Sequence, residues 1–239
     1  MHRSAPRLTR ILACAAVPVM LVVAGCSSDS DSGSKKDSGS SSAASPDAKT
    51  SPTVAAARFA KLSDPCKSIS AKTIAKLVPQ TKVKAGTAGK STDVANRRSC
   101  SWNGLDDNGV KGSQYRWLDV SFLRYDSESS LGVSGEQRAK DNYAKEIAKA
   151  KATEGAKSVR TSPATGVGEA GTAIAYDLKK TGEDFTYATI LSRTGNVVVT
   201  LTYNGTGYAG AKSPASADLM KGAVAAAKEA VASVAVANK

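Results

Sequence analysis

The first 25 residues limit which part of the chain is available to fold. Arg3, Arg7 and Arg10 form a positive leader, and residues 11–25 are almost wholly apolar. A helix needs about 20 apolar residues to span a bilayer, so this run is too short to be a membrane anchor. A positive leader followed by a short apolar run is typical of a secretory signal peptide. We therefore expect residues 1–25 to be removed and the remaining chain to fold outside the cytoplasm.

A cysteine follows the apolar run directly. The segment Leu21–Cys26, with small residues before the cysteine, resembles the lipobox of bacterial lipoproteins. In that family the cysteine thiol carries a diacylglyceryl group and the new amino terminus is often acylated, so we expect palmitate-type chains. Two or three chains give stable anchoring, at about 0.8 kcal/mol per buried CH₂. The resemblance implies lipidation at Cys26 and a place on the outer face of the cell membrane. An ordinary signal peptide with a chance cysteine is the alternative.

Residues 26–53 contain Ser, Asp, Gly, Lys and Ala and almost no large apolar side chain. Such a segment cannot bury enough apolar surface to become ordered. We expect a disordered Ser/Asp/Gly tether there. Residues 54–239 are long enough to bury a core of their own, so we expect one globular domain after the tether.

The four cysteines divide by position. Cys14 leaves with the signal peptide and Cys26 is the expected lipid site, so Cys66 and Cys100 remain. An exported context favours a disulfide between them. Closing a loop of roughly 35 residues stabilises a fold by about 3–4 kcal/mol in the chain-entropy model. Two free thiols are the alternative.

Helix signals occur at three places. Ser70 is a candidate N-cap, Ile69 and Ile74 are placed as a hydrophobic staple, and Pro79 ends the segment. A second helix is expected over residues 135–152, and a third starting at Ser213-Pro214, where a cap precedes a proline. The expected inner stripe of the second helix is Ala139, Tyr143, Ile147 and Ala150.

Strand signals lie between these helices. Residues 115–125 alternate, with large side chains on both faces, and Gly195-Asn196 is a tight hairpin signal. Residues 80–97 are polar and contain glycine, which indicates a loop or a weak strand. Five strands are expected, over residues 98–103, 115–125, 172–178, 184–193 and 197–203. The predicted order is α-β-β-α-β-β-β-α. This is an α+β fold with one antiparallel sheet of about five strands and helices packed mainly on one face.

The positive charge is concentrated near the anchor. The formal net charge is +12, and the segment Arg58–Arg98 alone contains ten bases and two acids. Anionic envelope components, such as lipid headgroups or wall polymers, are the partners that this charge fits, whereas nucleic acid is not expected outside the cell. A solvated basic surface without a partner is the alternative. The candidate contact residues are Arg58, Lys61, Lys67, Lys72, Lys76, Arg97 and Arg98.

Most catalytic chemistry is excluded by composition. The single histidine is His2, inside the signal peptide, so Ser-His-Asp and Cys-His catalysis and histidine-ligated metal sites are not available. We expect no metal site, no cofactor and no enzymatic activity. Catalysis by carboxylates alone, for example Asp177 with Glu183 or Asp184, remains open because sequence does not give their distances.

Several short motifs occur together in this chain. After the lipobox and the tether come Asp64-Pro65-Cys66 before a short helix and Cys100-Ser101-Trp102 on a strand, followed by the Gly166–Ala170 loop. With these motifs the chain resembles a family of small actinomycete lipoproteins of unknown function. The resemblance covers residues 60–239 and implies an exported, cysteine-bridged α+β domain. It implies no catalytic residue.

These observations favour a lipid-anchored extracytoplasmic binding or interaction domain. Its ligand is unknown, and the basic segment is the candidate surface for an anionic envelope polymer or another envelope protein. Two alternatives stay open, namely a carboxylate-based envelope-modifying enzyme and a carrier of a small apolar ligand between helices and sheet.

Overall fold

A computed structural model describes residues 53–239, which belong to the compact unit Lys49–Lys239. The predicted signal peptide, the lipidation site Cys26 and nearly all of the predicted tether lie outside the described residues. Within the described part, three α-helices accompany one sheet. The helices are α1 (Ala71–Leu77), α2 (Gly135–Lys151) and α3 (Ser216–Val236).

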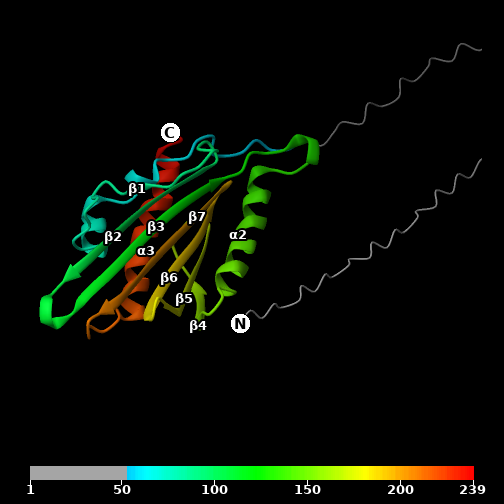
Figure 1. The fold of residues 1–239 in the computed structure, drawn as a ribbon. Helices are drawn as coiled ribbons and strands as arrows, with labels where there is room; N and C mark the ends of the chain where they lie inside the picture. Colours follow the sequence, from blue (N-terminus) through cyan, green and yellow to red (C-terminus); the bar gives the residue numbers. More distant parts are fainter. Residues whose placement is uncertain (1–52) are drawn as a thin grey trace, which may run out of the picture. The chain divides into compact units, whose positions relative to one another are not determined.

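The sheet has seven strands in the order β1-β2-β3-β7-β6-β5-β4, and every pairing is antiparallel (Figure 1). Strands β3 and β7 come from distant parts of the sequence and lie side by side in the middle, paired from Ser113 and Tyr208 to Arg124 and Val197. The strands are β1 (Thr87–Ala88), β2 (Arg97–Asp107), β3 (Ser113–Arg124), β4 (Lys157–Pro163), β5 (Ala170–Lys180), β6 (Glu183–Thr194) and β7 (Val197–Tyr208).

Helices α1 and α3 pack on one face of the sheet, here called the α3 face. Every second residue of β3 points into it, and Leu118, Val120 and Phe122 are fully buried there. The contacting stripe of α3 consists largely of small residues, which let the helix lie close to the strands. These residues are Gly222, Ala223, Ala226, Ala227 and Ala230.

Helix α2 lies on the opposite face, here called the α2 face (Figure 1). Its predicted stripe is confirmed, because Ala139 is buried and Tyr143 and Ile147 pack against Ile174 and Tyr176 of β5. Two of the three described helices therefore share one face. The prediction that helices pack mainly on one face is right for α1 and α3 and wrong for α2.

Two strands were missed, and both are at the edges of the sheet. β1 has only two residues, inside the segment interpreted as a loop or weak strand. Every residue of β4 is exposed, so it has no alternation of polar and apolar side chains to reveal it. The five predicted strands correspond to β2, β3, β5, β6 and β7. The α+β class and the antiparallel sheet are confirmed, and the number of strands is corrected to seven.

The start of the last helix also differs from the prediction. α3 begins at Ser216 with Ala215 as its N-cap residue, and Ala215 offers no side-chain capping bond. Ser213 does not cap the helix because its hydroxyl donates to the carbonyl of Asp184 at 2.8 Å. By contrast, the cap of α1 is as predicted, since the Ser70 hydroxyl accepts from the amide of Thr73.

The disulfide between Cys66 and Cys100 is present in the structure. It joins the 3₁₀ turn Pro65–Lys67 to β2 across a sequence separation of 34 residues. Trp102, two residues further along β2, is buried on the same face, and its indole N–H donates to the carbonyl of Lys84. The bridge therefore ties the segment that precedes α1 to the core.

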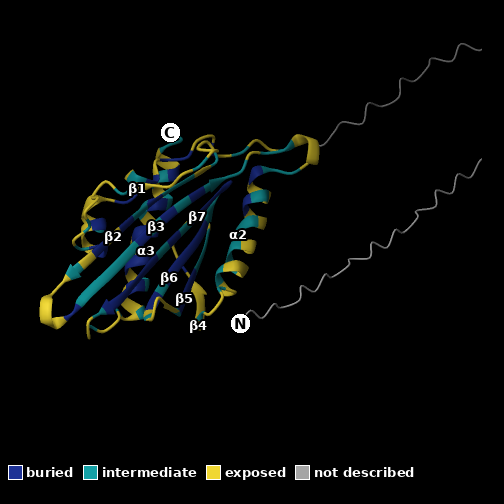
Figure 2. Ribbon diagram, in the orientation of Figure 1, coloured by how far each residue is buried: buried dark blue, intermediate teal, exposed yellow. Residues whose placement is uncertain are grey.

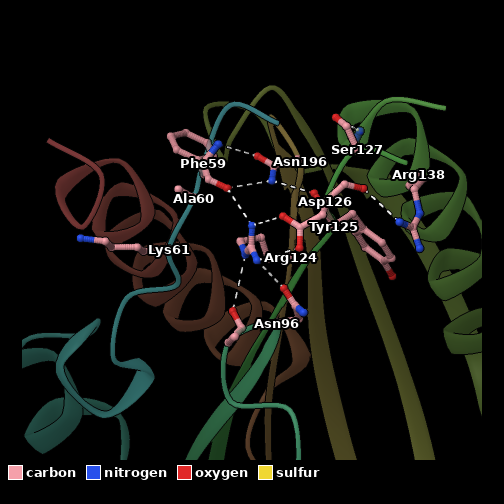
Figure 3. Close-up of polar contacts among 12 residues, drawn as sticks. Phe59, Ala60, Lys61, Asn96, Arg124, Tyr125, Asp126, Ser127, Arg138 and Asn196 are labelled. Atoms are coloured by element: carbon pink, nitrogen blue, oxygen red, sulfur yellow. Dashed lines mark hydrogen bonds and ion pairs between the residues drawn. The ribbon is translucent and has the colours of Figure 1, made fainter. Parts of the chain in front are cut away.

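A buried polar cluster holds the first described segment against the ends of the strands (Figure 3). The side chain of Arg124 is 9% exposed and pairs with Asp126. It also donates to the side chain of Asn96 and to the carbonyl of Phe59. Asn196, in the predicted hairpin turn between β6 and β7, bonds to both the amide and the carbonyl of Phe59. Because its donors are used internally, this arginine is structural. No helix within residues 53–239 is long and apolar enough to cross a membrane.

Candidate functional site

The α2 face is only partly covered. Helix α2 packs on β5, β6 and β7, and the α2-face side chains of β2 and β3 remain partly exposed. Figure 2 shows this as the intermediate burial of β3 beside the buried β7. We call the uncovered region over β2, β3 and β7 the open face. Its central positions are Ser99, Ser101, Asn103, Trp117, Asp119, Ser121, Thr200 and Thr202, and the buried Asn204 completes the register beside Trp117.

Strand register arranges these positions in three rows. Asp119 of β3 lies between Ser101 of β2 and Thr202 of β7. Trp117 lies between two asparagines, and Ser121 lies between a serine and a threonine. Every member except the tryptophan carries a carboxylate, amide or hydroxyl that can accept a hydrogen bond. Such a dense array of hydrogen-bonding groups on the inner strands of a sheet is unusual, because those positions more often carry apolar residues.

Asp119 is the most perturbed titratable group in the described part of the chain. Burial raises its pKa to about 6. Its side chain forms no hydrogen bond or ion pair with any other residue between 53 and 239. The surrounding side chains thus remove water from the carboxylate without replacing the lost hydrogen bonds. A perturbed acid of this kind, set on an open surface, is a candidate for ligand contact.

A row of aromatic side chains borders the polar positions. Tyr208 and Tyr115 meet edge to face at 6.4 Å between ring centroids, and Tyr115 and Phe185 meet at 6.1 Å. The row continues from Phe185 to Tyr187 and ends in a stacked pair, Tyr187 and Tyr176, with centroids 4.8 Å apart. These contacts extend over four strands. Tyr115, Tyr187 and Tyr208 keep part of their surface exposed.

Aromatic residues are concentrated on this side of the molecule. The chain contains twelve of them, counting two tryptophans, seven tyrosines and three phenylalanines. Eight lie on the α2 face, namely the five members of the row together with Trp117, Tyr125 and Tyr143. Ring faces provide flat apolar contact, and the adjacent polar groups provide directional bonds. The open face can therefore bind a ligand that presents both apolar faces and hydroxyl groups.

The basic residues predicted to contact anions are separated in the structure. Arg58 pairs with Glu169 at 2.6 Å, and Lys67 pairs with Asp64 at 3.8 Å. The remaining five lie on three separate parts of the chain. Lys61 precedes the 3₁₀ turn, Lys72 and Lys76 are exposed on α1, and Arg97 and Arg98 are successive residues of β2.

Successive strand residues point to opposite faces, so Arg97 and Arg98 do not share a surface. Arg97 lies on the α2 face, opposite Leu123. Arg98 lies on the other face, and its Nε donates to the carbonyl of Val94 at 2.7 Å. Of the seven residues, Lys76 lines a cleft beside α3, which is described below.

The acids considered for catalysis do not face one another across the hairpin of β5 and β6. Strand pairing places Asp177 opposite Thr186, whose hydroxyl donates to it at 3.1 Å. Glu183 and Asp184 lie opposite Lys180 and Lys179. Among residues 53–239, no group of three metal-binding side chains is close enough together to hold an ion.

The sequence analysis missed the open face as a site, although one signal for it was visible. Residues 115–125 carry large side chains on both faces, which indicated that the strand is covered on both sides. Three of those residues, Tyr115, Trp117 and Asp119, now belong to or border the open face. Their partners on β6 and β7 are 70 to 90 residues away, so only strand pairing shows that they form one surface.

Comparisons with known proteins give a family model and solved structures that are similar to this chain. A family model described as "Protein of unknown function (DUF3558)" matches residues 21–175. A solved structure, described as "Crystal structure of LpqN involved in cell envelope biogenesis of Mycobacterium tuberculosis", is 15% identical with a TM-score of 0.29, covering 60% of this chain and 82% of that chain. No curated protein matches the chain.

Proposed function

Since the chain belongs to the DUF3558 family of proteins of unknown function, we propose a function from its own residues. The protein is a lipid-anchored binding domain on the outer face of the cytoplasmic membrane. Its open face binds a saccharide of the cell envelope. The lipobox at Cys26 supports the anchor. The composition of the open face supports the ligand class.

One observation supports a saccharide as the ligand. Partly exposed aromatic rings lie beside carboxylate, amide and hydroxyl side chains, and among these Asp119 forms no hydrogen bond within residues 53–239. A sugar ring has apolar C–H faces that stack on aromatic rings and hydroxyl groups that bond to amides and carboxylates. An apolar ligand would cover Asp119 and leave its carboxylate without a partner, which costs free energy. A hydroxyl-rich ligand satisfies it.

The anchor is tested by two cysteine variants. Cys26→Ala removes the proposed lipid site, and we expect the protein to move from the membrane fraction to the soluble extracytoplasmic fraction. Cys14→Ala is the matched control, because it changes a cysteine of the same leader and leaves the lipobox intact. Retention of the Cys26→Ala protein in membranes would refute the lipid anchor.

The ligand class is tested by calorimetry with a panel of neutral oligosaccharides, including N-acetylglucosamine oligomers. We expect at least one to bind, and Asn103→Ala to weaken binding by about twofold to tenfold, since one hydrogen bond contributes about 0.5–1.5 kcal/mol. Asn103 is exposed on β2, so the fold should tolerate the change.

The control is Asn108→Ala, an exposed asparagine in the turn between β2 and β3. It should bind as the unchanged protein does. Equal weakening by both variants, or no binding of any saccharide in the panel, would count against the proposal.

A second candidate contact is electrostatic. We propose that exposed bases of the Arg58–Arg98 segment attract an anionic envelope polymer or an acidic envelope protein, and their charge excess supports this. Co-sedimentation with purified envelope at low and high salt tests it. The Debye length shortens from about 10 Å at 0.1 M to about 3 Å at 1 M salt, so electrostatic binding should disappear. Salt-resistant, saturable binding would instead indicate a specific partner at another surface.

The proposed role is binding without turnover. We expect no hydrolysis or modification of envelope polymers by the purified protein, and no requirement for a metal or cofactor. Product release from any of the oligosaccharides in the panel would support the carboxylate-based enzyme instead.

A further inference from the structure

A cleft lies on the α3 face, remote from the open face. It has a volume of about 540 Å³ and is bounded by α1, Pro79, β3, β7 and the first turns of α3. Its lining is partly basic and partly apolar. The basic side chains are Lys76, Arg116 and Lys221.

Arg116 is the unusual one among the three basic side chains that line the cleft. It lies on β3 with a glycine opposite it on each neighbouring strand, Gly104 on β2 and Gly205 on β7. A Cβ atom on Gly205 would lie 2.8 Å from Nη1 of Arg116, so the glycine leaves the space that the guanidinium occupies. An arginine placed over glycines on an inner strand cannot be explained by apolar packing.

The guanidinium of Arg116 has few internal partners. Nη1 donates to the carbonyl of Tyr115 at 2.8 Å. Burial raises the pKa of Tyr203, and Arg116 lowers it through its charge and through a hydrogen bond to the Tyr203 hydroxyl. No carboxylate of residues 53–239 lies within 4.0 Å of Arg116. Arg124, by contrast, donates hydrogen bonds to four internal partners (Figure 3). A guanidinium has five N–H donors, so most of those on Arg116 remain for a ligand.

The rest of the cleft adds positive charge. Lys76 of α1 and Lys221 of α3 line it from two sides, and Asp218 is its single acidic lining residue. Three cations therefore outweigh one carboxylate. The cleft also adjoins the beginning of α3, where the N-cap residue Ala215 leaves the first amides without a side-chain acceptor. The positive end of the helix dipole adds to the same potential.

The floor of the cleft is apolar. Leu77 and Leu219 are buried there. Gly222 permits Leu77 to approach α3 closely, since a Cβ atom at that position would lie 2.6 Å from Cδ2 of Leu77. Tyr203 closes the base by donating its hydroxyl to the carbonyl of Leu77 at 2.5 Å. Cationic walls above an apolar floor fit a ligand with an anionic group attached to an apolar part.

From this juxtaposition we propose that the cleft between α1 and α3 binds a phosphate-bearing amphiphile, with the phosphate at Arg116, Lys76 and Lys221 and the apolar part against Leu77 and Leu219. Arginine binds phosphate through paired, charge-assisted hydrogen bonds. The same chemistry belongs to a membrane lipid headgroup and to a free phosphorylated molecule with an apolar part. The site is independent of the saccharide proposal, because it lies on the other face of the sheet.

The test is calorimetry on the full chain carrying Cys26→Ala, with octyl phosphate below its micellar concentration and with inorganic phosphate. We expect octyl phosphate to bind at least about tenfold more tightly than inorganic phosphate, because its chain buries apolar surface. Arg116→Gln should weaken octyl phosphate binding by about tenfold or more. Lys221→Gln should weaken it by a smaller factor.

Lys228→Gln is the matched control, since it makes the same exchange on an exposed position of α3 outside the cleft. It should leave binding unchanged, as should Asn103→Ala on the open face. Arg116→Gln removes a half-buried side chain, so its unfolding transition is measured alongside. Lys221→Gln, at an exposed position, keeps the test valid if Arg116→Gln does not fold.

Vesicles of phosphatidylglycerol distinguish the two sources. Vesicle binding that depends on Lys221 supports the site and assigns the ligand to the membrane. Octyl phosphate binding without vesicle binding supports the site and assigns it to a free molecule. The proposal is overturned if octyl phosphate does not bind, if it binds no better than inorganic phosphate, or if Lys228→Gln weakens binding as much as Lys221→Gln.

Discussion

Asn196 holds Phe59 by a reciprocal pair of hydrogen bonds. The amide of Phe59 donates to Oδ1 of Asn196 at 2.8 Å, and Nδ2 of Asn196 donates back to the carbonyl of Phe59 at 2.9 Å. The two residues are 137 positions apart, and Asn196 is fully buried. Nδ2 also donates to the carbonyl of Tyr125 (Figure 3). One side chain in a hairpin turn thus fixes the first described segment to the end of β3.

Replacing Asn196 by alanine should strongly destabilise the domain. The change leaves the amide of Phe59 and the carbonyl of Tyr125 without their partner in a buried place, while the carbonyl of Phe59 keeps its hydrogen bond from Arg124. Such losses cost about 1–3 kcal/mol each when no water enters. We expect the free energy of unfolding to fall by about 2–4 kcal/mol in chemical denaturation. Asn108→Ala, in an exposed turn, is the control and should change stability by less than about 0.5 kcal/mol. Equal effects of the two changes would contradict the role of Asn196.

Removing the disulfide should destabilise the fold without changing its core. The bridge closes a loop with a sequence separation of 34 residues, which corresponds to about 4 kcal/mol in the chain-entropy model. We expect the double variant Cys66→Ser and Cys100→Ser to lose about 3–4 kcal/mol in urea denaturation.

Reduction of the unchanged protein should reproduce most of that loss, whereas the double variant should not respond to reductant. Detection of two titratable thiols in the unreduced, denatured protein would show that the bridge is absent.

Asp119 should make stability depend on pH. Its folded pKa of about 6 is above the ordinary value of 3.8, so the folded state binds the proton more tightly than the unfolded state. Its contribution to stability is therefore fully present below about pH 4 and is lost as pH rises through 6. The loss amounts to roughly 2–3 kcal/mol, at about 1.4 kcal/mol per pKa unit.

The variant Asp119→Asn should lack this loss. Compared with the unchanged protein it should be more stable at pH 7.5 and no more stable at pH 4, as measured by denaturant unfolding at both values. Under the saccharide proposal it should also bind the ligand more weakly at pH 7.5, because an uncharged amide is a weaker acceptor than a carboxylate. Parallel pH profiles of the two proteins would show that Asp119 is not the group responsible.

Two nearby glycines should differ in their tolerance of alanine. Both have positive φ, +60° at Gly109 and +82° at Gly112, so both substitutions strain the backbone. A Cβ on Gly112 would also lie 2.5 Å from the carbonyl oxygen of Tyr208, whereas nothing lies within 4 Å of one on Gly109. We expect Gly109→Ala to cost about 1 kcal/mol and Gly112→Ala at least 1 kcal/mol more. Thermal unfolding of both variants measures the two losses of stability. Equal losses, or a larger loss for Gly109→Ala, would contradict the close approach of the start of β3 to the end of β7.

The sequence by itself determined what depends on neighbours a few residues apart. The cap at Ser70, the stripe of Tyr143 and Ile147, and the turn at Gly195-Asn196 were predicted because helical and strand periods and turn chemistry act locally. The antiparallel α+β class followed from the same signals. The disulfide was predicted because only two cysteines remained once the leader and the lipobox were set aside.

Tertiary structure alone decided which surfaces these elements make. Edge strand β4 is exposed along its length, so its pairing with β5 is not marked by any apolar pattern. The pairing of β3 with β7 places Asp119 beside Thr202, and the packing of α3 on the opposite face brings Lys221 to the cleft of Arg116. These neighbours are some 80 to 105 residues apart, so no local pattern in the sequence reveals them. Long-range strand pairing and helix placement are set by burial of the whole core, which no local segment determines.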